Sequence, residues 1–169
     1  MTTRQELERY LKVWTMTRMH KALGIAEPTE DEKSASFLCS GFESKMDMLQ
    51  NAEPTIFHST MMDINYSGKL QEGFKNYIFE PYFNAREPEY TNADGLANAM
   101  DRAQIMAEAF IRDAAEAKKE ARKRNSRELT MFFDCDNVQW DTAGPFGDGW
   151  ESVVLFMKIS IPFNYCVYE

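Results

Sequence analysis

Long apolar runs are absent from this sequence. No stretch approaches the roughly 20 apolar residues that a membrane-spanning helix requires, and the first residues, Met1-Thr2-Thr3-Arg4, lack the apolar core of a secretion signal. We therefore expect no membrane partner, and a protein that is made and kept in a cytoplasm-like compartment.

Cysteine and histidine are also scarce. The three cysteines, Cys39, Cys135 and Cys166, are an odd number at wide spacing, which indicates neither a disulfide framework nor a zinc site and favours buried free thiols. The two histidines, His20 and His58, occur in no nucleophile or metal motif. We interpret both as structural, and we expect no catalytic residue, no cofactor and no metal.

Other patterns that carry chemistry in proteins are incomplete here. The run Asp134-Cys135-Asp136-Asn137 places carboxylates two residues apart, but it lacks the further oxygen ligands and the glycine of a calcium loop. The glycines at 144, 147 and 149 do not follow a strand and open a helix, so they make a poor phosphate site. A pairing of Asp63 with either Asp134 or Glu80 for acid–base catalysis stays open.

The chain does contain enough apolar material for a core. Of its 169 residues, 44% are hydrophobic and 13% aromatic, which excludes a compositionally disordered protein. A chain of this length predicts one domain that spans residues 1–169.

The longest regular pattern covers residues 91–125. Small and apolar side chains recur there every three or four residues, which places them on one stripe of a helix: Leu96, Met100, Ala103, Ala107, Phe110, Ala114, Ala117 and Ala121. Thr91 is placed to cap the first turn, and cations gather near the negative end of the helix dipole. Because alanines fill much of the stripe, we expect a sheet to pack closely on it.

Shorter patterns predict the elements before this helix. A capping box of Thr3 and Glu6 begins a helix over residues 4–23, which Gly24 ends. Residues 27–33 are predicted as a loop, 36–42 as a short strand or buried turn, and 43–51 as a short helix. Alternation over 55–66 and apolar residues over 73–80 predict two strands of a hairpin, followed by an irregular connection over 81–90.

The C-terminal part predicts a second hairpin. Residues 129–140 alternate as a strand that needs a bulge near Asp136 and Asn137, and residues 142–149 have turn chemistry. From Trp150 to Phe163 the alternation is uninterrupted. The fold class that follows is α+β: an antiparallel sheet of about four strands in two hairpins, packed against the long helix and the N-terminal helix.

Charge is distributed unevenly, although the net charge of -8 argues against general nucleic-acid binding. Residues 118–127 hold six basic residues and one acid, whereas residues 128–169 hold seven acids and one lysine. One interpretation is that the basic residues compensate the negative end of the helix dipole and are otherwise solvated. The other is electrostatic docking between copies, for which the candidate interface residues are Lys118, Lys119, Arg122, Lys123, Arg124, Arg127, Asp134, Asp136 and Asp141.

The order of elements resembles that of the small neck and tail-terminator proteins of tailed bacteriophages. The features that carry the resemblance are an N-terminal helix, the hairpin over 55–80, a long helix introduced by Asn92-Ala93-Asp94, and a last strand after Gly149-Trp150. The resemblance implies a non-enzymatic virion protein that forms a ring between portal and tail, contacts other neck and tail proteins, and lets DNA pass without specific binding. The long 81–90 connection and the strongly basic helix end depart from that pattern.

Two other functions stay open. The first is a small-ligand-binding protein or enzyme, with Asp63, Asp134, Trp140 and Tyr66 lining a pocket on a curved sheet. It is motivated by the many aromatic residues and by polar residues within the strand alternation. The second is an adaptor that binds a basic partner through its acidic C-terminal part, with an affinity that falls as salt is added.

Overall fold

A computed structural model describes residues 2–38, 45–65, 70–71, 73–87 and 93–162. The elements, in chain order, are α1 (Thr3–Thr17), α2 (Met19–Leu23), α3 (Glu30–Ala35), α4 (Lys45–Gln50), β1 (His58–Asn65), β2 (Leu70–Gln71), β3 (Phe74–Arg86), α5 (Ala93–Lys123), the 3₁₀ helix η1 (Leu129–Phe132), β4 (Gln139–Phe146), the 3₁₀ helix η2 (Gly147–Gly149) and β5 (Trp150–Pro162). Among these described helices, none is both long and apolar enough to cross a membrane.

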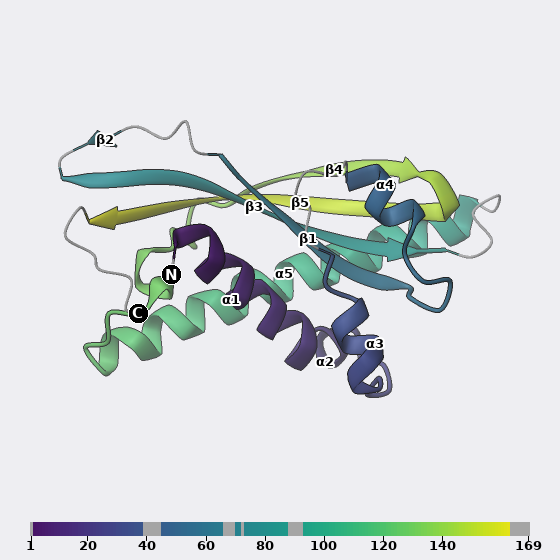
Figure 1. Ribbon diagram of the computed structural model, residues 1–169, viewed down its shortest axis with the longest axis horizontal. Helices are drawn as coiled ribbons and strands as arrows, with labels where there is room; N and C mark the ends of the chain where they lie inside the picture. The colour runs from purple at the N-terminus through teal and green to yellow at the C-terminus, as the bar shows by residue number, and fades with distance from the viewer. Residues whose placement is uncertain (1, 39–44, 66–69, 72, 88–92, 163–169) are drawn as a thin grey trace.

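The strands form one antiparallel sheet in the order β1-β3-β5-β4, with β2 paired to β3 outside this path. The first hairpin is β1 with β3, and the second is β4 with β5. The long strands β3 and β5 pair in the middle and join the two hairpins into one sheet. Helices α1 and α5 lie on the same face of the sheet (Figure 1). The predicted α+β class with two hairpins is therefore confirmed.

The main core lies between α5 and the sheet. Phe110 of α5 is fully buried and stands at the centre of an aromatic cluster, with ring centroids 5.4 Å from Trp14, 5.8 Å from Tyr10, 5.3 Å from Phe83 and 6.4 Å from Phe79. The alternating residues of β5 face this core, as the sequence predicts: Val153, Leu155, Met157, Ile159 and Ile161. Buried alanines on α5 let the helix and the sheet approach closely.

A smaller core covers part of the opposite face. Leu49 of α4 packs there with Ile56, Met61 and Trp150. Four consecutive residues of β1, Ser59 to Met62, are buried, so both faces of this strand are covered near its middle. A strand covered on one face only would alternate between buried and exposed residues.

The N-terminal helical region differs from the prediction in three ways. Thr2 caps α1, with Gln5 as its capping-box partner, so the helix begins one residue earlier than Thr3 and Glu6 suggest. The predicted single helix breaks at Arg18 into α1 and α2. Residues predicted as a loop begin α3, because Thr29 and Glu32 form a second capping box.

The β3 strand is longer than predicted. The prediction ends this strand at Glu80 and assigns 81–90 to an irregular connection, but β3 continues through Pro81 to Arg86. Pairing with β5 lapses at Glu80 and Pro81 and resumes at Tyr82 in the same register. Proline has no backbone N–H, so it removes one donor from the hydrogen-bond ladder. The register of β3 against β5 is nevertheless the same on both sides of Pro81.

The segment after α5 also differs. Residues 129–132 form η1 instead of a strand, and only Phe133 bridges to Ile159 before the chain turns. The predicted bulge at Asp136 and Asn137 is a turn, in which both backbone N–H groups donate to the Asp134 carboxylate at 3.2 and 3.3 Å. Strand β4 then runs through most of the segment predicted as a turn.

Candidate functional site

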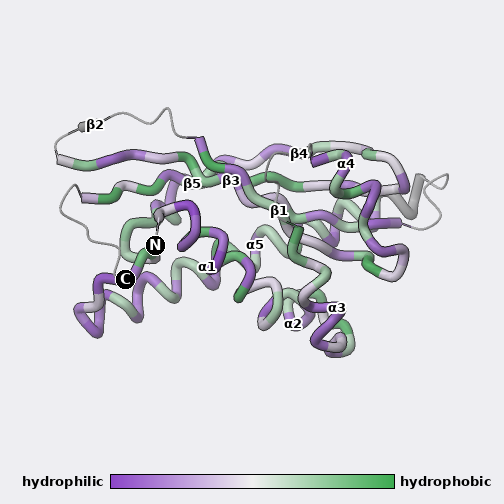
Figure 2. The backbone as a smooth tube through the Cα atoms, viewed as in Figure 1, coloured by the Kyte–Doolittle hydropathy of each residue, from purple (hydrophilic) through white to green (hydrophobic). Residues whose placement is uncertain are grey.

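The basic end of α5 is a run of hydrophilic residues (Figure 2), but local contacts neutralise much of its charge. Three of the six cations pair with carboxylates that lie close in sequence, and a fourth donates to a backbone carbonyl: Lys119 with Glu116 (3.7 Å), Lys123 with Glu120 (2.7 Å), Arg124 with Glu128 (3.1 Å), and Lys118 with the carbonyl of Phe133. These four side chains are therefore partly committed within their own molecule.

The remaining two cations are Arg122 and Arg127. Both are exposed, and neither forms a salt bridge with any residue that the structure describes. The charge that this end presents to another molecule is therefore concentrated on two guanidinium groups.

The candidate acidic residues lie in two places. Asp134 is in the turn after η1, close to Lys118; burial alone raises the pKa of Asp134, but hydrogen bonds from Asn137 and Asp136 and the charge of Lys118 hold it below its ordinary value. Asp136 is exposed in the same turn, whereas Asp141 is exposed on β4. The structure thus brings Lys118 and Asp134 together within one molecule and leaves Asp141 apart from them.

Among the strands that the structure describes, β4 lies at an edge of the sheet, and β5 alone pairs with it. Its side chains are mostly exposed, and Trp140 is 58% exposed. The opposite edge strand, β1, is covered near its middle, because Leu38 N–H donates to the Thr60 carbonyl (2.7 Å) and Thr60 N–H donates to the Ser36 carbonyl (2.9 Å). An edge strand offers unpaired N–H and C=O groups to another chain, so β4 is a candidate docking edge.

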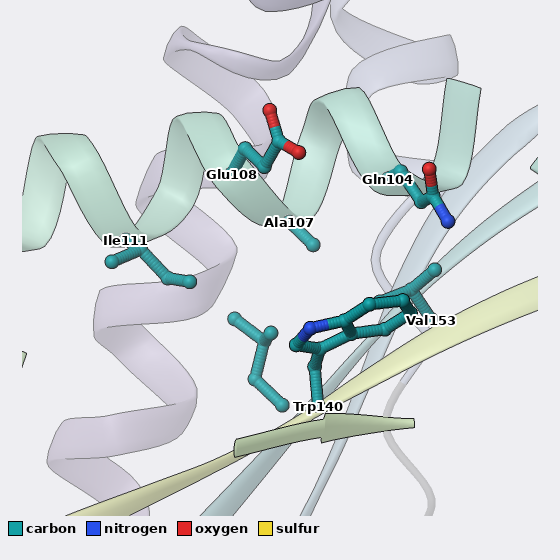
Figure 3. Close-up of a pocket in the computed structure, with 7 residues that line it drawn as sticks. Gln104, Ala107, Glu108, Ile111, Trp140 and Val153 are labelled. Atoms are coloured by element: carbon teal, nitrogen blue, oxygen red, sulfur yellow. The ribbon is translucent and has the colours of Figure 1, made fainter. Parts of the chain in front are cut away.

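A small apolar pocket lies beneath Trp140, between β4, β5 and α5. Trp140 pairs opposite Leu155, so its side chain is on the face that α5 covers. The pocket has a volume of about 120 Å³ and is lined by Gln104, Ala107, Glu108, Ile111, Trp140, Val153 and Leu155. In Figure 3, Ala107 and Ile111 point from the helix towards the indole ring.

A polar cluster occupies the opposite face of the sheet. Asp63 of β1 pairs directly opposite Glu80 of β3, and Lys45 Nζ is 3.0 Å from Asp63 Oδ2 and 5.0 Å from the centre of the Tyr82 ring. Burial and the Asp63 charge raise the pKa of Glu80. Burial opposes ionisation of Asp63 too, but hydrogen bonds from Lys45 and from the Ile64 N–H, together with the positive charges of Lys45 and Arg4, outweigh it and lower the Asp63 pKa.

Of the two acid–base pairings left open by the sequence, the structure forms Asp63 with Glu80. Asp134 lies beyond β5, since its N–H donates to the carbonyl of Lys158, and β3 and β5 separate it from Asp63. Carboxylates whose pKa values are pushed apart are typical of acid–base sites, but Lys45 already gives Asp63 a structural partner. The residues suggested for a ligand pocket do not meet: Asp63, Asp134 and Trp140 lie in three places, and Tyr66 lies outside the described residues.

A larger pocket brings the two histidines together. It has a volume of about 340 Å³ and lies between α1, α2, α3 and the start of β1, where it is lined by Thr15, Met19, His20, Ile25, Ala26, Glu27, Pro28, Glu32, Lys33, Ser36, Thr55, Ile56, Phe57 and His58. His20 is only 6% exposed, and His20 Nδ1 and His58 Nε2 are buried without a hydrogen-bond partner in the described structure. No sequence signal joins these residues, because 37 positions and two kinds of element separate them.

The described side chains offer little to a metal ion. Within the described ranges, no group of three or more His, Cys, Asp or Glu residues is arranged to hold one. Cys135 is half-buried and has a free thiol whose pKa burial raises, while Cys39 and Cys166 lie outside the described residues.

Comparison with known proteins returned no relative. No family model, no curated protein and no solved structure matches this chain.

Proposed function

We propose that this chain is a non-enzymatic structural subunit that assembles with copies of itself into a closed ring in the neck or tail of a tailed-bacteriophage virion, as a tail terminator or adaptor. The order of elements carries the proposal: an N-terminal helix, a long hairpin, a long helix and a closing hairpin on one antiparallel sheet. This is the order on which the resemblance to neck and tail-terminator proteins rests.

The charge distribution supports a ring in particular. Rings are built from heterologous contacts, in which one surface of a subunit meets a different surface of the next. The exposed guanidinium groups of Arg122 and Arg127 lie near the C-terminal end of α5, whereas the exposed carboxylates of Asp141 and Asp148 belong to β4 and η2 in the second hairpin. The net charge of -8 also suits a channel through which DNA passes without being held.

The mass of the purified protein in solution tests this proposal. We expect sedimentation equilibrium over a range of protein concentrations to show an oligomer whose mass is a multiple of 19.6 kDa, and electron microscopy to show rings with a central channel. A protein that stays monomeric at high concentration, both alone and with phage neck proteins, would overturn the proposal.

A small-ligand-binding protein is the second candidate function. The observation that favours it is the pocket of about 340 Å³ that the two histidines line, since small-molecule sites occupy roughly 300–1,000 Å³. A thermal-shift screen with small polar molecules tests it, because a ligand that binds only the folded state raises the melting temperature. A hit that His20→Phe abolishes while the variant stays folded would support this function, and the absence of any such hit would remove its basis.

A further inference from the structure

We infer that the pocket between α1, α2, α3 and the start of β1 binds a small uncharged molecule with a hydroxyl group on an apolar ring body, and that this hydroxyl pairs with the imidazoles of His20 and His58. This inference rests on the second candidate function, small-ligand binding, and adds the class of ligand. Three features of the pocket carry it: two imidazoles without partners, an apolar lining at its mouth, and charges of both signs around it.

The two imidazoles are polar groups of the pocket that lack partners. His20 Nδ1 and His58 Nε2 are buried without a hydrogen-bond partner, and neither ring forms a hydrogen bond within the part of the chain that the structure describes. Buried polar side-chain atoms usually have a partner, so a ligand that supplies one removes a desolvation cost. Because a half-turn about the Cβ–Cγ bond exchanges nitrogen and carbon positions, one of the two orientations presents a nitrogen to any edge of the ring.

The other buried polar groups of the lining already have partners. The hydroxyls of Thr15 and Ser36 each donate to a backbone carbonyl, at 2.9 and 2.8 Å. The ammonium of Lys33 lies 2.8 and 2.9 Å from two glutamate carboxylates. The imidazoles are therefore the groups to which the polar part of a ligand is directed.

A hydroxyl group matches a neutral imidazole. Burial and the charge of Arg102 lower the pKa of His58 to about 4, so this ring is neutral at pH 7. A neutral imidazole has one donor and one acceptor nitrogen, and a hydroxyl group both donates and accepts. An alcohol or a phenol therefore pairs with the ring in either tautomer.

The charges around the pocket disfavour a charged ligand. The exposed carboxylates of Glu27 and Glu32 belong to its lining and repel an anion, and the buried ammonium of Lys33 is already held by two carboxylates. A cation meets this ammonium and the positive charge of Arg102, which acts on His58. Because burying a charge without a partner is costly, the pocket favours an uncharged ligand.

The apolar part of the lining fits the body of such a ligand. Ile25 and Phe57 line the pocket and are 43% and 39% exposed, whereas Met19 and Ile56 line it and are buried. The volume of about 340 Å³ lies within the roughly 300–1,000 Å³ of small-molecule sites. Two fused rings that carry one hydroxyl group are therefore a suitable probe.

Three naphthalene derivatives of similar shape test the class of ligand. At pH 7, 2-naphthol is uncharged, 2-naphthoate is an anion and 2-(aminomethyl)naphthalene is a cation. In calorimetric titrations of the full chain, we expect 2-naphthol to bind at least about 10-fold more tightly than either charged probe. Amide shifts of ¹⁵N-labelled protein should place it beside Ile25 and Phe57. Equal affinities, tighter binding of a charged probe, or shifts confined to another region would overturn the inference.

Substitution of both imidazoles tests their role. The double variant His20→Phe/His58→Phe keeps rings of similar size and removes only nitrogens that have no hydrogen-bond partner among the described residues, so we expect it to stay folded. It should bind 2-naphthol at least about 10-fold more weakly than the wild-type protein.

Val13→Ser is the control for the double variant, because Val13 is 52% exposed on α1 and does not belong to the lining of this pocket. We expect its affinity for 2-naphthol to stay within about 3-fold of wild type. Circular dichroism checks that the variants are folded. An unchanged affinity in the folded double variant would show that the imidazoles do not bind the hydroxyl group.

The outcomes separate this inference from the function on which it rests. If a charged probe binds in the pocket and 2-naphthol does not, small-ligand binding stands and the uncharged class is wrong. If none of the three probes binds the wild-type protein, the inference falls, and the thermal-shift screen decides the broader function.

Discussion

At the scale of single residues, His58 is a group that the fold keeps uncharged. Its side chain is largely buried at the start of β1, and burial, together with the nearby charge of Arg102, lowers the pKa of His58 from 6.5 to about 4. His58 Nε2 is buried and makes no hydrogen bond within the described structure. The folded protein therefore binds a proton at this site less readily than the unfolded chain does.

We predict a loss of stability when the pH falls from 6.5 to 4. In this window the unfolded state binds more protons than the folded state at His58, so the free energy of unfolding decreases as the pH decreases. The effect is fully present near pH 4, and we expect about 2 kcal/mol after allowance for partial exposure of the side chain. Urea unfolding of the wild-type protein and of His58→Gln at several pH values measures it. An equal pH dependence in the two proteins would contradict this prediction.

Asn84 joins three strands by its side chain on the face of the sheet opposite α5. Its amide nitrogen donates to the Ser59 carbonyl (3.3 Å) and hydroxyl (3.2 Å), and the Ser152 hydroxyl donates to its amide oxygen (2.5 Å). All three residues are fully buried. A buried polar group that loses its partners carries its full desolvation cost.

We therefore predict that Asn84→Ala lowers the free energy of unfolding by about 2–3 kcal/mol. Asn76→Ala is a matched control on the same strand, because Ser160 donates to its amide oxygen at 2.6 Å but the pair is only partly buried. We expect the control to cost about 1 kcal/mol or less. Denaturant unfolding of both variants checks the difference, and equal losses would show that burial does not set the cost.

At the scale of elements, α5 holds the fold together through one face. The helix contacts β3, β5 and η1, and hydrogen bonds from Trp14 (2.9 Å) and Arg18 (3.1 Å) to Asp113 attach α1 to it. Four aromatic side chains from α1 and β3 contact the ring of Phe110. One side chain of α5 thus links the long helix, the N-terminal helix and the sheet.

We predict that Phe110→Ala lowers the free energy of unfolding by about 3–5 kcal/mol, because it removes this ring and leaves a cavity. Ile105→Ala on the same helix is the control: Ile105 is 44% exposed, and we expect a change below about 1 kcal/mol. Thermal and denaturant unfolding measure both. A small loss in Phe110→Ala would mean that the cluster rearranges to fill the space.

The elements that the sequence predicted well are those with one buried face. Strand β5 and helix α5 show regular apolar spacing because each packs one face against the core. Strand β4 was missed because most of its side chains are exposed, so no alternation marks it, and Gly144 and Pro145 resemble a turn. The prediction also ends β3 too early, at Glu80, because a proline such as Pro81 is unusual within a paired strand.

A candidate site could be predicted only where its residues are close together in the sequence. The basic end of α5 is visible as a run of charges, and the spacing of Glu116 from Lys119 and of Glu120 from Lys123 already indicates local pairing. The pocket with His20 and His58 depends on long-range packing of helices against a strand. Only the folded structure shows which distant residues meet there.

At the scale of the whole molecule, self-association should depend on the two arginines and much less on the paired lysines. Each salt bridge of Lys119 and Lys123 stays within its own helix, whereas Arg122 and Arg127 keep their charge available to another copy. Charges that attract across an interface make association weaker at higher ionic strength. The two pairs of cations therefore allow the same change in net charge to be made with different expected results.

We predict that the double variant Arg122→Gln/Arg127→Gln associates at least about 10-fold more weakly than the wild-type protein at low salt, a loss of about 1.4 kcal/mol. It should also lose most of the salt dependence of association, because the charges that salt screens are gone. The control, Lys119→Gln/Lys123→Gln, alters the net charge equally and should stay within about 3-fold of wild type. Sedimentation equilibrium between low and high salt measures all three proteins. Equal effects of the two double variants would mean that net charge alone governs association, and a head-to-tail contact at the arginines would then be wrong.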